Sequence, residues 1–439
     1  MKRGLLVLLF VGFISQLSKA QFLYKEKLDS YFNALEENDK FMGSVVLSKQ
    51  GTIVYSKTIG YLDVEKKLKA NQNSKYRIGS ISKTFTAVLV LKAFEEQLID
   101  LDQTIVDYFP TIKNADQITI KQLLSHRSGI HNFTSDKDYV EWCTSPKTKK
   151  EVVGIISQGG SDFIPGSKSQ YSNSNYVLLS FILETIYKQP FAHIIESKIT
   201  KPLDLKNTYY GGTIDPQNQE CLSYTFLGSW QVESQTDLSI PMGAGGIVST
   251  ASDLTKFSEA LFEGVLLKSE SLEMMKTLKD GFGLGLFQYP FDSHKGFGHT
   301  GGIDAFRSFL VHFIEDEITY AMVSNGSNYV INKINIAVLS AAFDQPFDLP
   351  EFSTFEVISA DLDPYLGVYT SDQFPLDITI SKKNNTLIAQ ATGQPSFALE
   401  AYQKNKFKFD QAGVMMEFNP RERTLLFKQA GREFLLVKE

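Results

Sequence analysis

Apolar positions in the first half of the chain switch between helical and strand periodicity. An amphipathic helix is predicted over residues 24–36, and two β-branched runs then lie on either side of residues 49–51. The K-Q-G turn between those runs is typical of a β-hairpin. A helical pattern covers residues 80–98 without Gly or Pro, and residues 100–230 are mostly helical or loop. The first half therefore predicts a strand pair followed by a helical block.

Strand character returns near residue 283. Two β-rich runs, at 305–314 and 318–324, flank the acidic turn E-D-E, and a helix is predicted over about 331–343. Strands therefore open and close this region, with helices between them. That order predicts an α+β domain whose single sheet is assembled from both ends of the region and packs beside a helical insertion.

The C-terminal part has a different pattern. The chain becomes polar and contains prolines from residue 344 onward, and we interpret residues 346–354 as a linker. Seven or eight short strands then follow one another over residues 355–439, separated by turns that contain Asn and Gly. This density of strands predicts a small C-terminal β-barrel or sandwich after a first domain over residues 21–345.

Residues 1–20 have the order of a secretory signal peptide. Two basic residues precede an apolar stretch from Leu5 to Ile14, and the sequence S-K-A ends at Ala20. The apolar stretch is too short to span a bilayer as a helix, although a retained membrane anchor is the alternative. No cysteine follows Ala20, so lipid attachment is not indicated. We predict a secreted or periplasmic mature chain that starts near Gln21 and has no integral membrane segment.

Composition and charge narrow the classes of partner. The 439 residues are 43% hydrophobic and 21% charged, which is typical of folded globular proteins. A net charge of −6 without a long basic run gives no indication of nucleic acid or an anionic membrane as partner. The two cysteines, Cys143 and Cys221, are compatible with a disulfide after export or with two free thiols. No metal or cofactor is predicted, a small molecule or peptide is the expected substrate, and the oligomeric state is left open.

The stretch R-I-G-S-I-S-K-T-F at residues 77–85 contains the one S-x-x-K of the chain. At helical spacing Ser80 and Lys83 share a face, so the amine can reach the hydroxyl, whereas Ser82 points elsewhere. A lysine buried among apolar groups has a lowered pKa and can accept a proton near neutral pH. The alternative is that Ser80 or Ser82 caps a helix and Lys83 is solvated.

Two later motifs carry polar groups that suit the same chemistry. Tyr171-x-Asn173 supplies a tyrosine that could act as general acid or base if a nearby cation lowered its pKa, and an amide that could orient Lys83 or a substrate. The structural alternative is a loop tyrosine and a helix-capping asparagine. The glycine-rich sequence G-H-T-G-G, in which a substrate could approach the strand backbone or which could be only a turn, supplies His299, Thr300, Gly301 and Gly302.

In this order the three motifs resemble the serine β-lactamase and penicillin-binding protein superfamily, and within it the class C β-lactamase-related branch. Two further segments also resemble the family, L-L-S-H-R-S-G-I at 123–130 and G-A-G-G-I-V-S-T-A-S-D-L-T-K-F at 243–257. The resemblance therefore covers roughly residues 24–345. The C-terminal strands resemble the lipocalin-like β-domain of some members. The resemblance implies a β-lactamase-like sheet flanked by helices with a helical subdomain, followed by a small β-barrel domain.

The resemblance also implies roles for the motif residues. Ser80 would be acylated, and Lys83 and Tyr171 would share the proton transfers. The backbone N–H groups of Ser80 and Gly302 would form the oxyanion hole. Substrate binding would fall to Asn173, His299, Thr300, Gly301 and Gly302. His126 and Asp253 are interpreted as structural.

His299 stands where many β-lactamases carry Lys. His-Thr-Gly at this position is more similar to D-alanyl-D-alanine carboxypeptidases and related peptidases and esterases, which favours them over a dedicated β-lactamase. The first hypothesis is therefore an exported serine peptidase that acts on D-amino-acid-containing peptides. The alternatives are an esterase or, after it, a β-lactamase with the same serine, and a catalytically inactive binding protein, against which the complete motif set counts. The C-terminal domain could narrow the cleft, bind a ligand or stabilise the chain.

Overall fold

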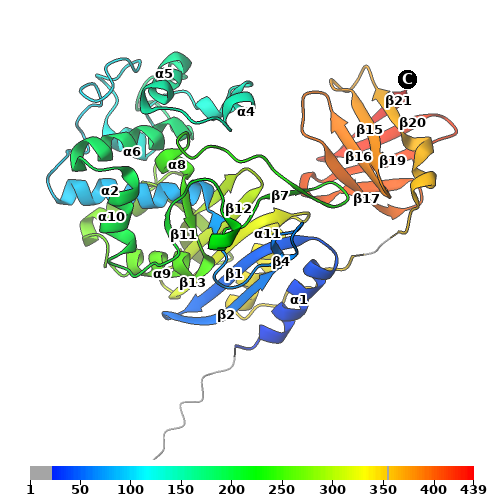
Figure 1. The fold of residues 1–439 in the computed structure, drawn as a ribbon, viewed down its shortest axis with the longest axis horizontal. Helices are drawn as coiled ribbons and strands as arrows, with labels where there is room; N and C mark the ends of the chain where they lie inside the picture. Colours follow the sequence, from blue (N-terminus) through cyan, green and yellow to red (C-terminus); the bar gives the residue numbers. More distant parts are fainter. Residues whose placement is uncertain (1–21, 353–354) are drawn as a thin grey trace, which may run out of the picture.

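The main sheet joins the two ends of the first domain. β1 (Phe41–Lys49) pairs with β2 (Thr52–Ile59) on one side and with β13 (Ile318–Ser327) on the other, and both pairs are antiparallel. The path continues from β13 through β12 (Phe306–Phe313) and β11 (His294–Ile303) to β10 (Phe287–Phe291). The predicted hairpin and the predicted assembly from both ends are therefore confirmed. The structure is a computed structural model that describes residues 22–352 and 355–439, so the predicted signal peptide lies outside it (Figure 1).

Helices cover both faces of this sheet, which explains why the β1 residues before Lys49 are all buried. On one face, α1 (Lys25–Glu37) and α11 (Ile331–Ala342) pack against it through residues such as Leu28 and Val338. On the other face, α9 (Ala251–Phe262) lies against β1, β12 and β13. Its Phe257 ring stacks on Phe85, with ring centroids 3.7 Å apart, and so joins the sheet to the helical block.

The helical block lies between the N-terminal and C-terminal strands of the sheet in sequence, as the pattern predicted. Its central helix, α2 (Ser82–Glu95), is covered by its neighbours and is buried along most of its length. A small sheet of β5 (Tyr76–Arg77), β9 (Ile247–Ser249) and β6 (Tyr209–Tyr210) leads into it. The helices of the block are α2 (Ser82–Glu95), α3 (Ile120–Leu124), α4 (Tyr139–Trp142), α5 (Lys149–Gly159), α6 (Asn173–Tyr187), α7 (Phe191–Ile195), α8 (Met242–Gly245) and α10 (Ser269–Lys276).

The C-terminal residues form a closed eight-stranded barrel, which confirms the barrel alternative. Each strand pairs with the next along the chain, and β14 (Gly367–Thr370) closes the barrel by pairing with β21 (Arg432–Lys438). The strands are β14 (Gly367–Thr370), β15 (Ile378–Lys383), β16 (Thr386–Ala391), β17 (Phe397–Gln403), β18 (Lys406–Phe409), β19 (Val414–Asn419), β20 (Thr424–Gln429) and β21 (Arg432–Lys438).

The interior of the barrel is a packed core. Alternate residues of the strands point inward, and Leu387, Met416, Leu425 and Leu436 have no exposed surface. Eight strands enclose a space that side chains of this size can fill. The barrel is therefore stabilised by its own hydrophobic cluster, separate from the two clusters of the first domain.

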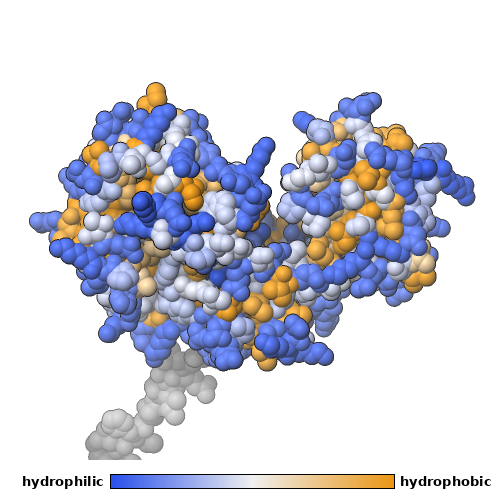
Figure 2. Space-filling model, turned by 45° about the horizontal axis from the view of Figure 1, so that its top comes forward, coloured by the Kyte–Doolittle hydropathy of each residue, from blue (hydrophilic) through white to orange (hydrophobic). Residues whose placement is uncertain are grey.

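The barrel contacts the first domain over a limited region, and the two lobes are distinct in Figure 2. An ion pair joins Lys40 to Glu400, and Gln411 Nε2 donates to the carbonyl of Ser327 at 2.7 Å. A hairpin of β7 (Tyr224–Phe226) and β8 (Trp230–Val232) extends the main sheet toward the barrel, where its turn lies against Thr386. These contacts fix the barrel beside the sheet rather than over the helical block (Figure 1).

Three other observations complete the fold. Cys143 and Cys221 are buried and free, so the free-thiol alternative holds. Within residues 22–352 and 355–439, no helix combines the length and apolar character needed to cross a bilayer. In the same residues, no three His, Cys, Asp or Glu side chains gather as metal ligands would.

The barrel core provides a matched test of packing on a single strand. Leu436 has no exposed surface, whereas its neighbour Leu435 is 56% exposed. We expect Leu436→Ala to lower the free energy of unfolding of the barrel by about 2–5 kcal/mol, because it leaves a cavity. Leu435→Ala should change it by less than about 0.5 kcal/mol. Urea denaturation followed by circular dichroism measures both, and equal effects of the two substitutions would contradict the packed interior.

Candidate active site

Ser80 lies in a single turn of 3₁₀-helix, Gly79–Ile81, between β5 and α2. The predicted helix therefore begins two residues later, at Ser82, because the chain first makes this tighter turn. Neither serine side chain caps α2. Ser82 Oγ instead accepts a hydrogen bond from the backbone N–H of Ile247 at 3.1 Å, which leaves Ser80 as the hydroxyl that faces Lys83.

The predicted catalytic side chains form one hydrogen-bonded group. Lys83 Nζ is 2.9 Å from Ser80 Oγ, and the hydroxyl of Tyr171 donates to the same Ser80 Oγ at 2.8 Å. Tyr171 comes from the loop before α6, 91 residues after Ser80. The structure thus brings together the first two motifs around a single oxygen.

Lys83 is a fully buried lysine with three oxygen neighbours. Besides Ser80 Oγ, its Nζ lies 2.8 Å from Asn173 Oδ1 and 2.7 Å from the carbonyl oxygen of Ala244. Burial lowers the pKa of Lys83 well below its ordinary value, since the charged form loses its hydration. A neutral amine has two hydrogens and one lone pair. Because the oxygens of Asn173 and Ala244 can only accept, they take the two hydrogens, and the lone pair faces the Ser80 hydroxyl.

The pKa of Tyr171 is shifted in the opposite direction to that of Lys83. Burial raises the pKa of Tyr171, and the nearby Lys83, 4.9 Å from the ring centre, does not reverse this. The condition under which a tyrosine would act as a base, a pKa lowered by a cation, is therefore not met in the resting site. Tyr171 stays protonated and donates to Ser80 Oγ, and this supports Lys83 as the group that accepts the serine proton.

Asn173 is held on both sides of its amide. Oδ1 faces Lys83, and Nδ2 donates to Thr134 Oγ1 at 2.8 Å. Its backbone N–H donates to Asn132 Oδ1 at 2.9 Å, which places the residue at the start of α6. The predicted orientation of Lys83 by Asn173 therefore has a geometric basis.

His299 is buried on β11 close to Tyr171, with the two ring centres 6.3 Å apart. Its Nδ1 lies 2.5 Å from the carbonyl of Thr300, so Nδ1 carries the hydrogen and Nε2 is an acceptor. Nε2 has no hydrogen-bond partner among the described residues. Burial, reinforced by Lys83, lowers the pKa of His299 to about 3, so the ring is neutral at physiological pH.

The glycines of the third motif have different surroundings. A Cβ on Gly301 would lie 2.0 Å from the carbonyl oxygen of Ile78, so this glycine admits the protein's own chain rather than a substrate. A Cβ on Gly302 would meet nothing closer than 3.6 Å, and Gly302 and Thr300 are exposed. Gly302 and Thr300 are thus the residues of the motif that a substrate can approach.

A close backbone approach joins the two halves of the site. Gly79 has a φ of +51°, and a Cβ there would lie 2.7 Å from the backbone nitrogen of Gly302. The segment that carries Ser80 therefore lies directly against the exposed end of β11. This is the neighbourhood that the predicted oxyanion hole requires, although the hole itself stays a prediction.

The sequence did not indicate one contributor to the site. Ala244 acts through its backbone carbonyl, which no side-chain pattern reveals, although it lies in the glycine-rich stretch at 243–257. His126 is structural, as the sequence predicts: its Nδ1 accepts a hydrogen bond from the backbone N–H of Ser172 at 3.2 Å. Its ring also lies 4.5 Å from the ring of Tyr171, so it helps to fix the orientation of that phenol.

The Beta-lactamase family model matches residues 28–341, and the chain belongs to this family. With the Ser80, Lys83 and Tyr171 group described above, it is a serine hydrolase related to penicillin-binding proteins. Among curated relatives, penicillin-binding protein 4* of Bacillus subtilis (strain 168) is 24% identical, over 94% of this chain and 97% of the relative.

Solved structures extend the comparison. D-amino acid amidase from Ochrobactrum anthropi SV3, complexed with L-phenylalanine amide, has 25% identity and a TM-score of 0.65, covering 73% of this chain and 99% of the amidase. The octameric penicillin-binding protein homologue from Pyrococcus abyssi covers 94% of this chain and 99% of its own, with a TM-score of 0.63. At 22% identity the second likeness shows the fold alone.

The Gly79 contact generates a prediction. We expect Gly79→Ala to lower the rate of Ser80 acylation by at least about 10²-fold, because the added Cβ must push Gly302 away and displace an oxyanion donor. Gly51→Ala is the matched control, since Gly51 has a φ of +68° but open space around it. Both substitutions carry backbone strain, and only the first should slow labelling by a fluorophosphonate. Equal labelling rates in the two variants would show that the contact does not matter.

The pKa of Lys83 predicts a pH dependence. Lys83 accepts a proton only when neutral, so acylation should rise with pH as the folded-state pKa of Lys83 is crossed and then level off. Because burial lowers that pKa, the rise should occur far below the ordinary lysine value of about 10.4. The measurement is the labelling rate of a neutral probe across pH at constant ionic strength. A rate that stays low until pH approaches 10 would contradict a neutral resting Lys83.

Proposed function

We propose that the protein is an exported serine peptidase or amidase that cleaves amide bonds next to D-amino acids, as D-Ala-D-Ala carboxypeptidases do. The single observation that carries the proposal is the Ser80 hydroxyl held between the phenol of Tyr171 and the buried amine of Lys83. The structural likeness to a D-amino acid amidase supports this substrate class. The signal-like residues 1–20 support export.

The first half of the reaction is acyl transfer to the serine. Ser80 Oγ forms a bond to the carbonyl carbon of the substrate, while its proton passes to the lone pair of Lys83. The negative charge that develops on the carbonyl oxygen is stabilised by the backbone N–H groups of Ser80 and Gly302. The C–N bond then breaks, and the departing amine takes the proton of the Tyr171 hydroxyl, which is replaced by the proton held on Lys83; this leaves an acyl-serine ester.

The second half is hydrolysis of that ester. Water replaces the departed amine and gives a proton to the same group of side chains as its oxygen attacks the acyl carbon. The bond to Ser80 Oγ breaks, Oγ regains a proton, and a carboxylic acid leaves. Tyr171 remains a hydrogen-bond donor in the resting state because burial raises its pKa, and this suits a proton relay better than a permanent base.

The neutral His299 favours a peptidase or amidase over a dedicated β-lactamase. Many β-lactamases carry Lys, a charged side chain, at this position. A histidine with a pKa of about 3 supplies no such charge at neutral pH. Thr300 and Gly302 are exposed beside it and can accept or donate hydrogen bonds to a peptide or amide instead. An esterase with the same serine is the second candidate, because the acylation step is common to both.

A substrate panel tests the proposal. The wild-type protein should be labelled by a fluorophosphonate and should hydrolyse D-phenylalanine amide and a D-Ala-D-Ala peptide faster than a fluorescent penicillin. Ser80→Ala should abolish labelling and lower turnover by at least about 10⁴-fold, and Lys83→Ala should lower it by about 10²–10⁴-fold. The intact mass of the exported protein should correspond to a chain that starts near Gln21.

Ser82→Ala is the control for the nucleophile. It removes a neighbouring hydroxyl that bonds to the backbone N–H of Ile247 and leaves Ser80 in place, so labelling should persist. Labelling of Ser80→Ala at the wild-type rate would overturn the assignment of the nucleophile. Turnover of a p-nitrophenyl ester without turnover of any D-amide or D-peptide would overturn the peptidase proposal in favour of the esterase.

A further inference from the structure

A buried ion pair connects the two backbone segments that flank the reacting centre. Arg77 is in β5, three residues before Ser80, and Asp304 follows β11, two residues after Gly302. Arg77 Nη1 lies 3.0 Å from Asp304 Oδ2, and the two side chains are 2% and 3% exposed. The pair therefore spans the same two segments that Gly79 and Gly302 bring together.

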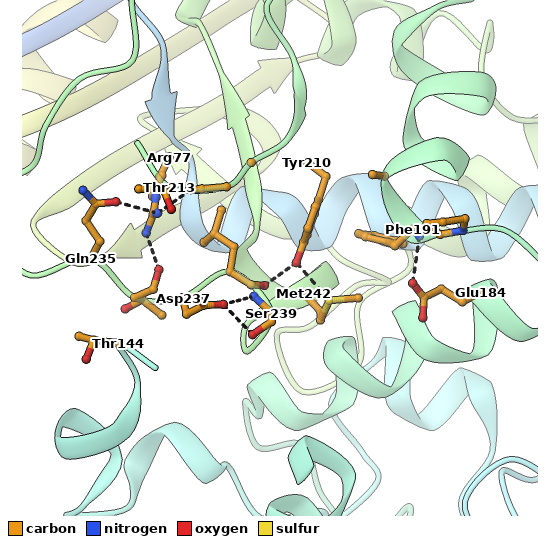
Figure 3. A pocket seen from close by; sticks show the side chains of 16 residues that line it. Arg77, Thr144, Glu184, Phe191, Tyr210, Thr213, Gln235, Asp237, Ser239 and Met242 are labelled. Atoms are coloured by element: carbon orange, nitrogen blue, oxygen red, sulfur yellow. Dashed lines mark hydrogen bonds between the residues drawn. The ribbon is translucent and has the colours of Figure 1, made fainter. Parts of the chain in front are cut away.

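Both partners are held by further hydrogen bonds. Asp304 Oδ1 accepts from the backbone N–H of Thr236 at 3.0 Å and from its hydroxyl at 2.7 Å. Arg77 donates to the carbonyl oxygens of Thr236 at 2.7 Å and Gly212 at 2.9 Å. Arg77 Nε has no hydrogen-bond partner in the described residues. Figure 3 shows Arg77 with Gln235 at the wall of a cavity of about 720 Å³, none of whose lining residues is a predicted catalytic residue.

We propose that Arg77 and Asp304 are positioning residues for the acylation step, which fix the distance between the N–H groups of Ser80 and Gly302. The inference rests on the proposed acyl-serine chemistry and adds to it the group that sets the geometry of the oxyanion hole. Neither side chain touches the substrate in this role. Their effect reaches the reacting atoms through the short backbone segments 77–80 and 302–304.

Energetics favour positioning over stability as the role of the pair. Removing two charges from water is costly, and well-packed apolar side chains often stabilise a protein as much as a buried ion pair does. What the pair supplies is geometry, because a planar guanidinium and a carboxylate accept few relative orientations. Asp304 also has a φ of +51°, which fits its place in the two-residue turn between β11 and β12, so a tight hairpin presents its carboxylate to Arg77.

A second interaction, a hydrogen bond, also holds the nucleophile segment, but it acts at a different position in the chain. Ser308 Oγ on β12 donates to the carbonyl of Ile78 at 2.7 Å, and this holds the nucleophile segment against the sheet. It does not hold the turn that follows Gly302. Since oxyanion donors act at 2.7–3.1 Å and functional groups must be placed within about 0.5 Å, loss of the Asp304 tie should be felt in the rate.

Asp304→Asn is the most direct test. Asparagine tolerates a positive φ and can still accept from Thr236, but it cannot form the ion pair. We expect kcat for a p-nitrophenyl ester and the fluorophosphonate labelling rate to fall by about 10²–10³-fold, with KM changed by less than about threefold. A purely structural role would lower the folded fraction and leave the rate per folded molecule unchanged.

The double variant Arg77→Met/Asp304→Asn keeps the test valid if the single variant fails to fold. It removes both charges, so no unpaired ion stays buried, and thermal unfolding should be close to wild type while kcat falls as in Asp304→Asn. Wild-type kcat in either folded variant would overturn the proposal. A rise in KM at constant kcat would do the same, since it would indicate a role in binding alone.

Lys40→Met is the matched control. It removes the ion pair between the buried Lys40 and the part-exposed Glu400 of the barrel, and should leave kcat and labelling unchanged. An equal fall of kcat in Lys40→Met would overturn the proposal, because the loss of an ion pair far from Ser80 would then suffice. Failure of the proposed chemistry is distinguishable, since it would appear as undiminished labelling of Ser80→Ala.

Discussion

The burial of Lys83 is the constraint on which the rest of the site depends. A lysine without exposed surface is tolerated only where its hydrogens have acceptors and its charge is lost or compensated. The fold supplies two oxygens that only accept, from Asn173 and Ala244, and a hydroxyl at the third position. One comes from the start of α6 and one from α8, so three distant parts of the sequence must be in place before the amine is satisfied. The same arrangement that makes the burial tolerable directs the lone pair of Lys83 at Ser80.

Backbone packing is as important as side-chain chemistry in this site. Gly79 and Gly301 leave no space for a Cβ, and their closeness lets the 3₁₀-turn at Ser80 lie against β11. Because the two segments belong to different structural units, their separation is set by what ties them, namely Ser308 to Ile78 and Arg77 to Asp304. The active site therefore lies where these two segments meet, and residues on either side of the reacting groups set the distance between the segments.

The sequence predicted much of the fold and of the chemical groups because both leave patterns in side chains. Apolar periodicity marked the hairpin, the long helix and the late strands, and the order of three motifs marked Ser80, Lys83, Tyr171 and His299. It could not show that the turn before α2 is 3₁₀ or that Gly79 in this turn lies against Gly302, which is distant in the sequence. A backbone carbonyl such as that of Ala244 has no side-chain signature. Arg77 and Asp304 are 227 residues apart, and neither local pattern indicates that they pair.

The position of β1 in the main sheet has a consequence for how the chain can fold. β1 needs β13 as a neighbour, and Phe41 is paired with Ser327, whereas the barrel strands pair almost entirely with their sequence neighbours. Pairings between such distant residues form slowly, and local ones form fast. A chain that ends anywhere before Ile318 would leave the apolar strand β1 with an open edge, the kind of surface that recruits other chains. During synthesis the first domain therefore stays incomplete, and exposed to aggregation, until nearly three quarters of the protein has been made.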